Sequence, residues 1–216
     1  MIKHYLKVAF RNLAKYKTQT LVSIIGLAVG FTCFALSVLW IRYEMTYDTF
    51  HEGADRIYMV RAHYTDSPGS ISNSTPYPLS SYLQEKMPEI EAAASTSIYR
   101  EMKFRMGDNE HEVVMAAADS VFMNFFNIQL LKGTVNFLKE NDPEIAITEE
   151  FARKLFGNEE DALGKEVELN GRSRKIGAIV SGWSRHSNIP YSVLVSARHY
   201  PRWGSTGEQL FVRVRA

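Results

Sequence analysis

The longest apolar segment of the chain covers residues 20–41, which read TLVSIIGLAVGFTCFALSVLWI and include no charged residue. A helix rises about 1.5 Å per residue, so about 20 residues cross a bilayer core that is about 30 Å thick. The segment lacks the polar face that a helix on a soluble domain shows. Because backbone groups in lipid must bond within their own segment, a helix is the expected structure. The pattern therefore predicts a transmembrane helix over residues 20–41.

A basic amphipathic segment precedes this helix. Over residues 2–17 apolar and aromatic side chains recur at helical spacing, while Lys3, Lys7 and Arg11 lie four residues apart on another face. Such a helix lies in the membrane interface, where anionic lipid attracts its basic face. Two roles stay open for it: a simple topology anchor, or a helix that also contacts a cytoplasmic partner.

The pattern after residue 41 changes to short segments of alternating and helical periodicity. No Gly or Pro interrupts residues 42–50, so we expect the membrane helix to continue outward to Phe50. Strands and helices then mix without regular alternation, which predicts a membrane-anchored α+β domain over residues 42–216. In the first half we expect a strand at 56–64, a loop at 65–78, a helix at 79–87 and a hairpin at 102–116. A short helix follows Asp119 and places Phe122, Phe125 and Phe126 in the core. In the second half we expect a strand at 144–148, a helix at 149–156 capped by Thr148, a hairpin around Asn170 and Gly171 that returns over 174–181, and a strand at 211–215.

The charges are divided unevenly around the apolar segment. Five of the 25 Lys and Arg residues precede it without any acid, whereas all 24 Asp and Glu residues follow it. Basic residues beside a span stay in the cytoplasm. We therefore predict an inner-membrane protein with residues 1–19 in the cytoplasm and residues 42–216 in the periplasm. A cleaved signal peptide is the alternative, but the apolar run is too long and Trp40-Ile41-Arg42 offers no small-residue cleavage site.

The same count bounds the partners and the chemistry of the outer part. Its net charge of about −4 (20 basic against 24 acidic residues) argues against nucleic acid as a partner. The single cysteine, Cys33, lies within the span, so the outer part has no disulfide and no thiolate metal site. Gly157 and Gly164-Lys165 are spaced too widely for a phosphate-binding loop, and the six histidines form no metal-ligand pair. We expect no enzymatic activity, no cofactor and no metal.

Two glycines interrupt the apolar face of the predicted span. Gly26 and Gly30 are four residues apart, which is the spacing that lets a second membrane helix approach closely. We expect this face to pack against another membrane helix.

Several segments together resemble the N-terminal part of MacB/FtsX-like ABC transporter permeases, in the form common in Bacteroidetes. The similarity is carried by the basic start at residues 11–17, the glycine-containing core at 26–30, the stretches 44–51 and 54–60, and the helix and turn at 152–157. It extends from Lys3 to about Ser196. One departure is His186-Ser187-Asn188, where the family often has Asn-Ser-His, so no role is carried onto those residues.

The resemblance implies a function that the residues alone do not. Permeases of this kind work with a separate ABC ATPase subunit and carry its motion outward to a periplasmic α+β core domain, for export, lipoprotein release or cell-wall regulation. It also implies further spans or a second permease copy, and it allows a periplasmic or outer-membrane export partner, so we expect the chain to be a fragment or a truncated gene product. The residues expected to serve are Glu44, Tyr47, Asp48 and Phe50 on the coupling helix, and Lys3, Lys7 and Arg11 at the membrane surface or the ATPase.

A single-pass, membrane-anchored periplasmic sensor or binding module is the alternative function. A sensor needs a signalling domain in the cytoplasm, and only about twenty residues precede the span. The sequence therefore favours the permease.

Overall fold

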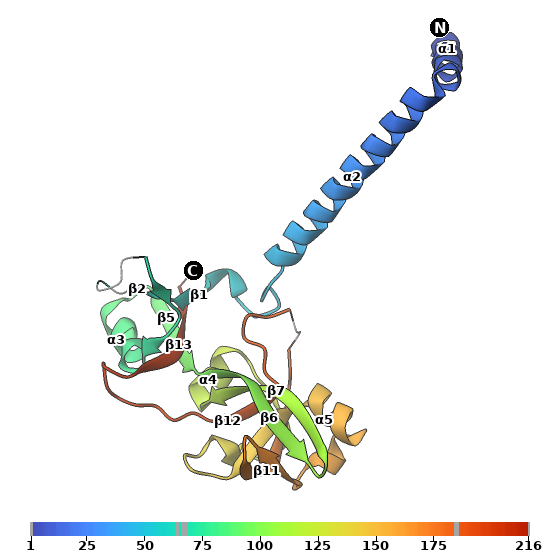
Figure 1. The fold of residues 1–216 in the computed structure, drawn as a ribbon. Helices are drawn as coiled ribbons and strands as arrows, with labels where there is room; N and C mark the ends of the chain where they lie inside the picture. The colour runs from blue at the N-terminus through green and yellow to red at the C-terminus, as the bar shows by residue number, and fades with distance from the viewer. Residues whose placement is uncertain (1, 64, 66–68, 184–185, 216) are drawn as a thin grey trace. The chain divides into compact units, whose positions relative to one another are not determined.

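The computed structural model describes residues 2–63, 65, 69–183 and 186–215. The chain divides into two compact units, Met1–Tyr47 and Asp48–Ala216 (Figure 1). Each unit is considered by itself below.

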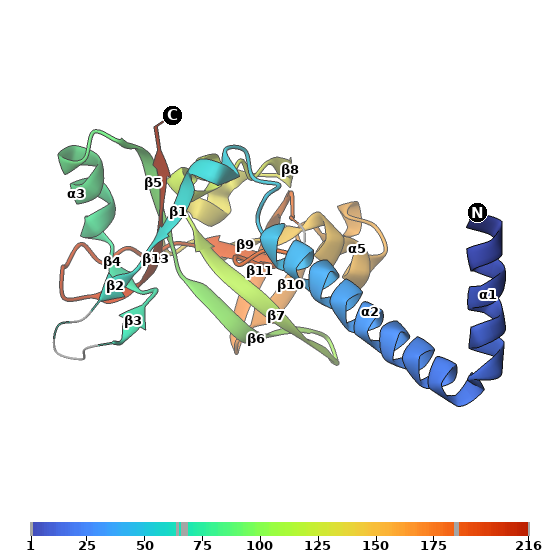
Figure 2. The same ribbon diagram turned by 90° about the horizontal axis from the view of Figure 1, so that it is seen from above.

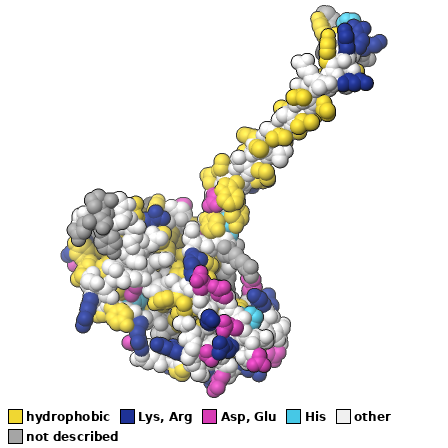
Figure 3. All heavy atoms as spheres, in the orientation of Figure 1, with side chains coloured by type: hydrophobic (Ala, Val, Ile, Leu, Met, Phe, Trp, Pro, Cys, Tyr) yellow, Lys and Arg dark blue, Asp and Glu magenta, His cyan; other side chains and the backbone are white. Residues whose placement is uncertain are grey.

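The first unit consists of two helices. Helix α1 covers Ile2–Lys15 and helix α2 covers Lys17–Met45, with a break at Tyr16, whose φ of −106° and ψ of 60° are not helical. Helix α2 is the one helix among the described residues that is long and apolar enough to cross a membrane, and none of its residues is buried. Figure 3 shows hydrophobic side chains along its length and no charge over its middle. The predicted span lies within α2, which extends beyond it at both ends.

Helix α2 ends earlier than the sequence suggests. The predicted continuation to Phe50 is wrong, because the helix stops at Met45 and a turn follows. The hydroxyl of Thr46 donates to the carbonyl oxygens of Arg42 (3.2 Å) and Tyr43 (2.9 Å), which satisfies acceptors that the next helical turn would have used. Asp48 then adopts a φ of +55°, and a residue in this left-handed region cannot continue a right-handed helix.

The larger part of the second unit is a closed barrel of six strands (Figure 2). The hydrogen-bonded order is β10 (Glu166–Leu169), β6 (Ile98–Met106), β7 (Asn109–Ala118), β12 (Val193–Ser196), β9 (Glu144–Thr148), β11 (Arg172–Val180) and back to β10. The pairs β7–β12 and β9–β11 are parallel and the others are antiparallel. Strand β8 (Leu130–Gly133) adds to β11 outside the ring. The predicted turn between β10 and β11 is confirmed: Asn170 (φ +50°) and Gly171 (φ +78°) both have positive φ, as a tight type I′ hairpin requires.

Helix α5 (Glu149–Phe156) packs on the barrel core with the bounds that the sequence predicts. The Thr148 hydroxyl accepts a hydrogen bond from the Phe151 amide at 3.3 Å, and Gly157 follows the helix with a φ of +75°. Phe151 packs edge-on against Phe104, which is fully buried. The other buried members of this core come from the remaining five strands, from α5 and from the turn at 160–162: Val113, Ile145, Ile147, Ala152, Ala162, Val167, Leu169, Ile176, Ile179 and Val193.

A smaller sheet completes the second unit. Strand β13 (Thr206–Val214) lies between β5 (Ile90–Thr96) on one edge and β1 (Ile57–Val60) with β4 (Thr75–Pro76) on the other. Helix α3 (Pro78–Lys86) covers one face. Helix α4 (Ser120–Phe125) lies between the two sheets, and its predicted cap is confirmed, because Asp119 accepts from the Phe122 amide at 2.7 Å. Phe122, Phe125 and Phe126 are buried, as expected.

The sequence missed several elements of this unit. Residues 65–78, predicted as a loop, include β4 and also β3 (Ile71–Ser72), which pairs with β2 (Ala62–His63) in a two-stranded ribbon. The strand predicted at 56–64 is divided into β1 and β2, and its last residue, Tyr64, lies outside the described residues. Strands β5, β8 and β12 and the first half of β13 were also not predicted. The described residues also include three short 3₁₀ turns, at Ala54–Arg56, Val135–Leu138 and Glu160–Ala162.

Candidate functional site

Asp48, the first residue of the second unit, is held by a loop that lies far away in the sequence. Its carboxylate accepts hydrogen bonds from the Ser187 hydroxyl (2.5 Å), from the Asn188 backbone amide (3.1 Å) and from the Asn188 side chain (2.8 Å). Its own amide donates to the carbonyl oxygen of His186 at 3.3 Å. We call Asp48 with residues 186–188 the Asp48 clamp. It joins segments 140 residues apart at a point three residues beyond the end of α2.

Within the clamp, Ser187 is buried and continues the hydrogen bonding inward. Its oxygen donates to Asp48 and accepts from the amide of Ile189 at 3.0 Å, so each bond polarises the next. The carboxylate charge strengthens the bonds that it accepts.

His51 follows the clamp and lies in an aromatic cluster, the His51 box, formed with Phe50, Phe126 and Trp183. Its ring centroid is 4.3 Å from that of Phe50, 5.0 Å from Phe126 and 4.8 Å from Trp183. Burial lowers the pKa of His51 below its ordinary value, and Asp48, whose Oδ1 is 3.9 Å from Nε2, only partly opposes that shift. The imidazole is therefore neutral at pH 7 and acts as an aromatic packing group.

The indole of Trp183 connects the His51 box to the residues that follow the Asp48 clamp. Its Nε1 donates to the carbonyl oxygen of Ile189 at 2.8 Å, and its ring packs edge-on against Tyr191 at 4.6 Å. The hydroxyl of Tyr191 in turn donates to the carbonyl oxygen of Ser181 at 2.6 Å. These bonds fix residues 181–183 and 186–191 as a support for the segment 48–51.

A second polar cluster lies elsewhere in the unit, around His199. Its Nδ1 is 3.1 Å from Glu208 and its Nε2 is 3.0 Å from Asp119, with Tyr77 stacked on the ring at 3.9 Å. Burial alone would lower the pKa of His199, but its hydrogen bonds to Asp119 and Glu208 outweigh burial and raise it to about 9. Because both ring nitrogens are occupied by carboxylates, the cluster is an ion-paired connection between β13 and the start of α4.

No group of three or more potential metal ligands is found among the described residues. The structure brings together two of the predicted site residues, Asp48 in the clamp and Phe50 in the His51 box. The others belong to the helices and turn of the first unit: Lys7 and Arg11 exposed on α1, Gly26, Gly30 and Glu44 exposed on α2, and Tyr47 in the turn after it. The side chain of Lys3 lies outside the described part of the structure.

The functional roles assigned to these residues stay predictions. Around Gly26 and Gly30 a Cβ would meet no atom of the described chain within 4 Å, so this face of α2 has room for another helix. Sequence reasoning missed His51, Ser187 and Asn188. The available signal was that residues 44–51 and 186–188 both fall within the segments compared with the permease family.

Comparisons with known proteins agree on the family and on the fold. The family model described as the MacB-like periplasmic core domain matches residues 20–216. No curated protein matches the chain. A domain of a putative permease protein from Porphyromonas gingivalis is similar, with 25% identity and a TM-score of 0.62, over 76% of this chain and 77% of that one.

Two further structures share the fold at lower identity. The extracellular domain of the noncanonic ABC-type transporter YknZ from Gram-positive bacteria has 14% identity and a TM-score of 0.53, over 74% of this chain and 82% of that one. The periplasmic region of MacB from Actinobacillus actinomycetemcomitans has 13% identity and a TM-score of 0.50, over 73% of each chain.

Proposed function

The chain belongs to the family of MacB-like periplasmic core domains, and on this premise we propose that it serves as the N-terminal part of an ABC transporter permease subunit. In this function a partner ATPase hydrolyses ATP in the cytoplasm, and the permease converts that reaction into movement of its periplasmic domain. The permease subunit itself performs no chemistry. The output is export, or the handling of a peptide or lipoprotein.

The Asp48 clamp is the observation that carries this proposal. Only Thr46 and Tyr47 separate the end of α2 from Asp48. The three residue steps from Met45 to Asp48 reach about 11 Å at most, because an extended chain spans at most about 3.6 Å per residue. Any movement that would take the helix end farther than this from Asp48 must therefore pull on Asp48, and through it on residues 186–188. A short connector with a fixed far end can transmit movement, whereas a long flexible linker cannot.

The membrane arrangement forms part of the same proposal. The five basic residues before the apolar segment favour a cytoplasmic N-terminus and a periplasmic second unit in the inner membrane. Lys3, Lys7 and Arg11 would then face anionic lipid or the ATPase, and Gly26 with Gly30 would face a further span or a second permease copy. Alkaline phosphatase fused after Ala216 should be active, and a cytoplasmic reporter fused at the same site should be silent.

The coupling itself is tested by lengthening the connector. A Gly-Ser-Gly-Gly insertion between Thr46 and Tyr47 should leave ATP hydrolysis by the complete complex intact while export or other periplasmic output falls. The same insertion between Gly69 and Ser70, in an exposed turn, should be tolerated and serves as the control.

Two results would count against the coupling function. If the connector insertion left output unchanged, residues 46–47 would be only a tether, and the anchored sensor or binding module would become the better interpretation. If the rate of the ATPase never responded to this chain, that ATPase would not be its motor.

A further inference from the structure

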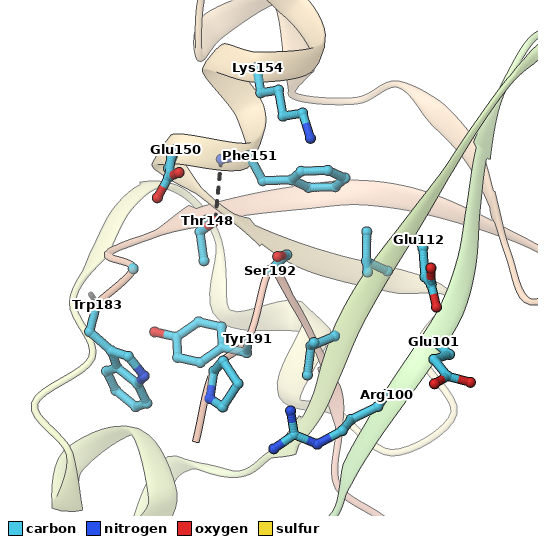
Figure 4. A pocket seen from close by; sticks show the side chains of 14 residues that line it. Arg100, Glu101, Glu112, Thr148, Glu150, Phe151, Lys154, Trp183, Tyr191 and Ser192 are labelled. Atoms are coloured by element: carbon cyan, nitrogen blue, oxygen red, sulfur yellow. Dashed lines mark hydrogen bonds between the residues drawn. The ribbon is translucent and has the colours of Figure 1, made fainter. Parts of the chain in front are cut away.

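The second unit contains a cleft that neither the clamp nor the proposed coupling uses. It has a volume of about 600 Å³, within the range of ligand sites, and lies between β7, α5 and residues 182–183 and 190–192 (Figure 4). The buried side chains of Phe151 and Tyr191 and the half-buried Trp183 line its inner side. Arg100 and Lys154 reach over it from opposite ends. We call it the β7 cleft.

One wall of the cleft is an open strand edge. Strand β7 pairs with β6 over residues 109–113, but β12 joins its other edge only from Met115 onward. Within the described residues no strand pairs with that other edge between Asn109 and Val113. The single backbone bond near its end is the one that the Val114 carbonyl accepts from the Ser192 amide at 2.8 Å.

The register shows which backbone groups face the cleft. Met106 and Asn109 close a two-residue turn, so residues 109, 111 and 113 exchange hydrogen bonds with β6. The backbone groups of the alternate residues, Glu110 and Glu112, therefore point away from β6 toward the open edge. An edge of this kind is a template for another strand.

The side chains around this edge define what such a strand would carry. Val113 is buried and points inward, whereas Glu112 is exposed on the outer face. Glu110 is neutralised by Lys103 (3.1 Å) and Arg105 (2.8 Å), but Glu112 has no ion pair among the described residues. Glu101 lies near Glu112 in Figure 4 and has no such pair either; a β-bulge between Tyr99 and Met102 holds it at a φ of +59°.

We propose that the β7 cleft binds an extended peptide segment of another protein, which adds to the open edge of β7 as a further strand. The peptide residue opposite Glu112 shares its outer face and lies close enough for a charge pair, so it is Lys or Arg. The residues before and after it point inward onto Phe151 and Tyr191, so they are apolar. The bound sequence therefore alternates basic and apolar residues. This inference is independent of the coupling function, because strand addition requires no ATP.

Binding is tested with the full chain in lipid nanodiscs and a fluorescein-labelled heptapeptide, Thr-Lys-Val-Lys-Val-Lys-Thr, followed by fluorescence anisotropy. Saturable binding is expected, and the same peptide with Glu in place of Lys should bind at least about tenfold more weakly. Two versions N-methylated on alternate amides separate strand addition from simple charge attraction. One version loses the N–H groups that face β7. Its binding should be weaker by about tenfold or more, since two or more hydrogen bonds are lost. The other version should bind like the parent peptide.

Variants of one residue supply the protein side of the test. Glu112→Gln should reduce the preference for Lys over Glu peptides several-fold and keep the backbone donor. Glu112→Pro should abolish binding, because it removes the N–H that faces the cleft and leaves the β6 ladder intact. Glu166 on β10 is also exposed and has no ion pair among the described residues. Glu166→Gln is therefore the matched control and should change neither the binding nor the preference for Lys peptides.

Benzophenone placed at either Val of the peptide, positions 3 and 5, locates the site. Cross-links to residues 110–114, 150–154 or 190–192 are expected. The proposal is overturned by cross-links elsewhere, by equal binding of both N-methylated peptides, or by no binding of any alternating peptide at millimolar concentration. A cross-link from β7 to a second copy of the chain, formed without peptide, would assign the edge to self-association and would also overturn it.

Discussion

Replacing Asp48 gives the most direct test of the clamp, and three substitutions separate its two contributions. Asp48→Ala removes every acceptor of the carboxylate. It also leaves at a φ of +55° a residue that has a Cβ but no polar side chain to form a local hydrogen bond. Asp48→Gly removes the same acceptors but adopts a positive φ without strain. Asp48→Asn retains the left-handed preference and one carbonyl oxygen, and loses the charge.

The expected free-energy changes follow from the partners of the carboxylate. Asn188 is exposed, so water replaces the acceptor for its two donors at little cost. Ser187 is buried, and its hydroxyl loses a charged acceptor, which costs about 2–3 kcal/mol. Asp48→Gly should therefore destabilise the second unit by about 2–3 kcal/mol, and Asp48→Ala by about 1 kcal/mol more because of the left-handed backbone. Asp48→Asn should cost about 1 kcal/mol, since one acceptor oxygen remains.

Urea unfolding of the full chain in nanodiscs, followed by tryptophan fluorescence, measures these differences. Hydrogen exchange supplies the location. The Ile189 amide, which donates to the Ser187 hydroxyl, and the Asn188 amide, which donates to Asp48, should lose protection in all three variants. Amides in the barrel strands should keep theirs, because local opening of a loop does not require the core to unfold.

Asp108→Ala is the matched control. Asp108 is exposed in the turn between β6 and β7 and makes no interaction among the described residues, so this change should stay within about 0.5 kcal/mol of the parent chain. The clamp reasoning is refuted if Asp48→Ala is equally neutral. The backbone part alone is refuted if the Ala and Gly variants have the same stability.

Three further outcomes are expected. The folded-state pKa of His199 is about 9, above its ordinary 6.5, so its stabilising contribution is complete below pH 6.5 and disappears as the pH rises to about 9. The stability difference between the parent chain and His199→Gln is measured by urea unfolding at several pH values. This difference should shrink between pH 6.5 and about 9 and should not shrink below pH 6.5. Gly133→Ala should cost about 3 kcal/mol or more, because its Cβ would lie 2.2 Å from a carbonyl oxygen of β11 at a φ of +87°, whereas Gly204→Ala, with no atom within 4 Å, should be nearly neutral in the same assay. Replacing Gly26 and Gly30 together by Leu should reduce co-purification with the further span or second permease copy proposed above and leave urea unfolding of the second unit unchanged.

Elements defined by local chemistry could be predicted from the sequence. Helix α5 has an N-cap hydroxyl at Thr148 and a stop at Gly157, and the β10–β11 hairpin has Asn170-Gly171 at the two positions that need positive φ. In both cases residues within a few positions of one another determine the backbone, so their pattern is visible in the chain.

Elements that depend on distant partners could not be predicted. Strand β5 reads Ile-Glu-Ala-Ala-Ala-Ser-Thr, a composition with weak strand preference, and it is extended because β13, more than 100 residues later, pairs with it along most of its length. The same holds for the end of α2. Residues 42–50 contain no helix breaker by composition, but Asp48 leaves the helical region where its carboxylate meets Ser187 and Asn188.

The clamp also changes how the connection between α2 and the domain has to be understood. A continuous helix to Phe50 would transmit movement along its axis through backbone hydrogen bonds. Here the backbone turns at Asp48, and the restraint passes sideways through side chains. It runs from the carboxylate to Ser187 and on to the amide of Ile189, whose carbonyl oxygen holds Trp183 in the His51 box. In the proposed coupling, a force at Asp48 would reach residues 186–191 and Trp183 through these bonds. Residues 186–191 lead directly into β12, a strand of the barrel, so in the proposed coupling the start of β12 is the part of the barrel that a pull on the connector would reach first.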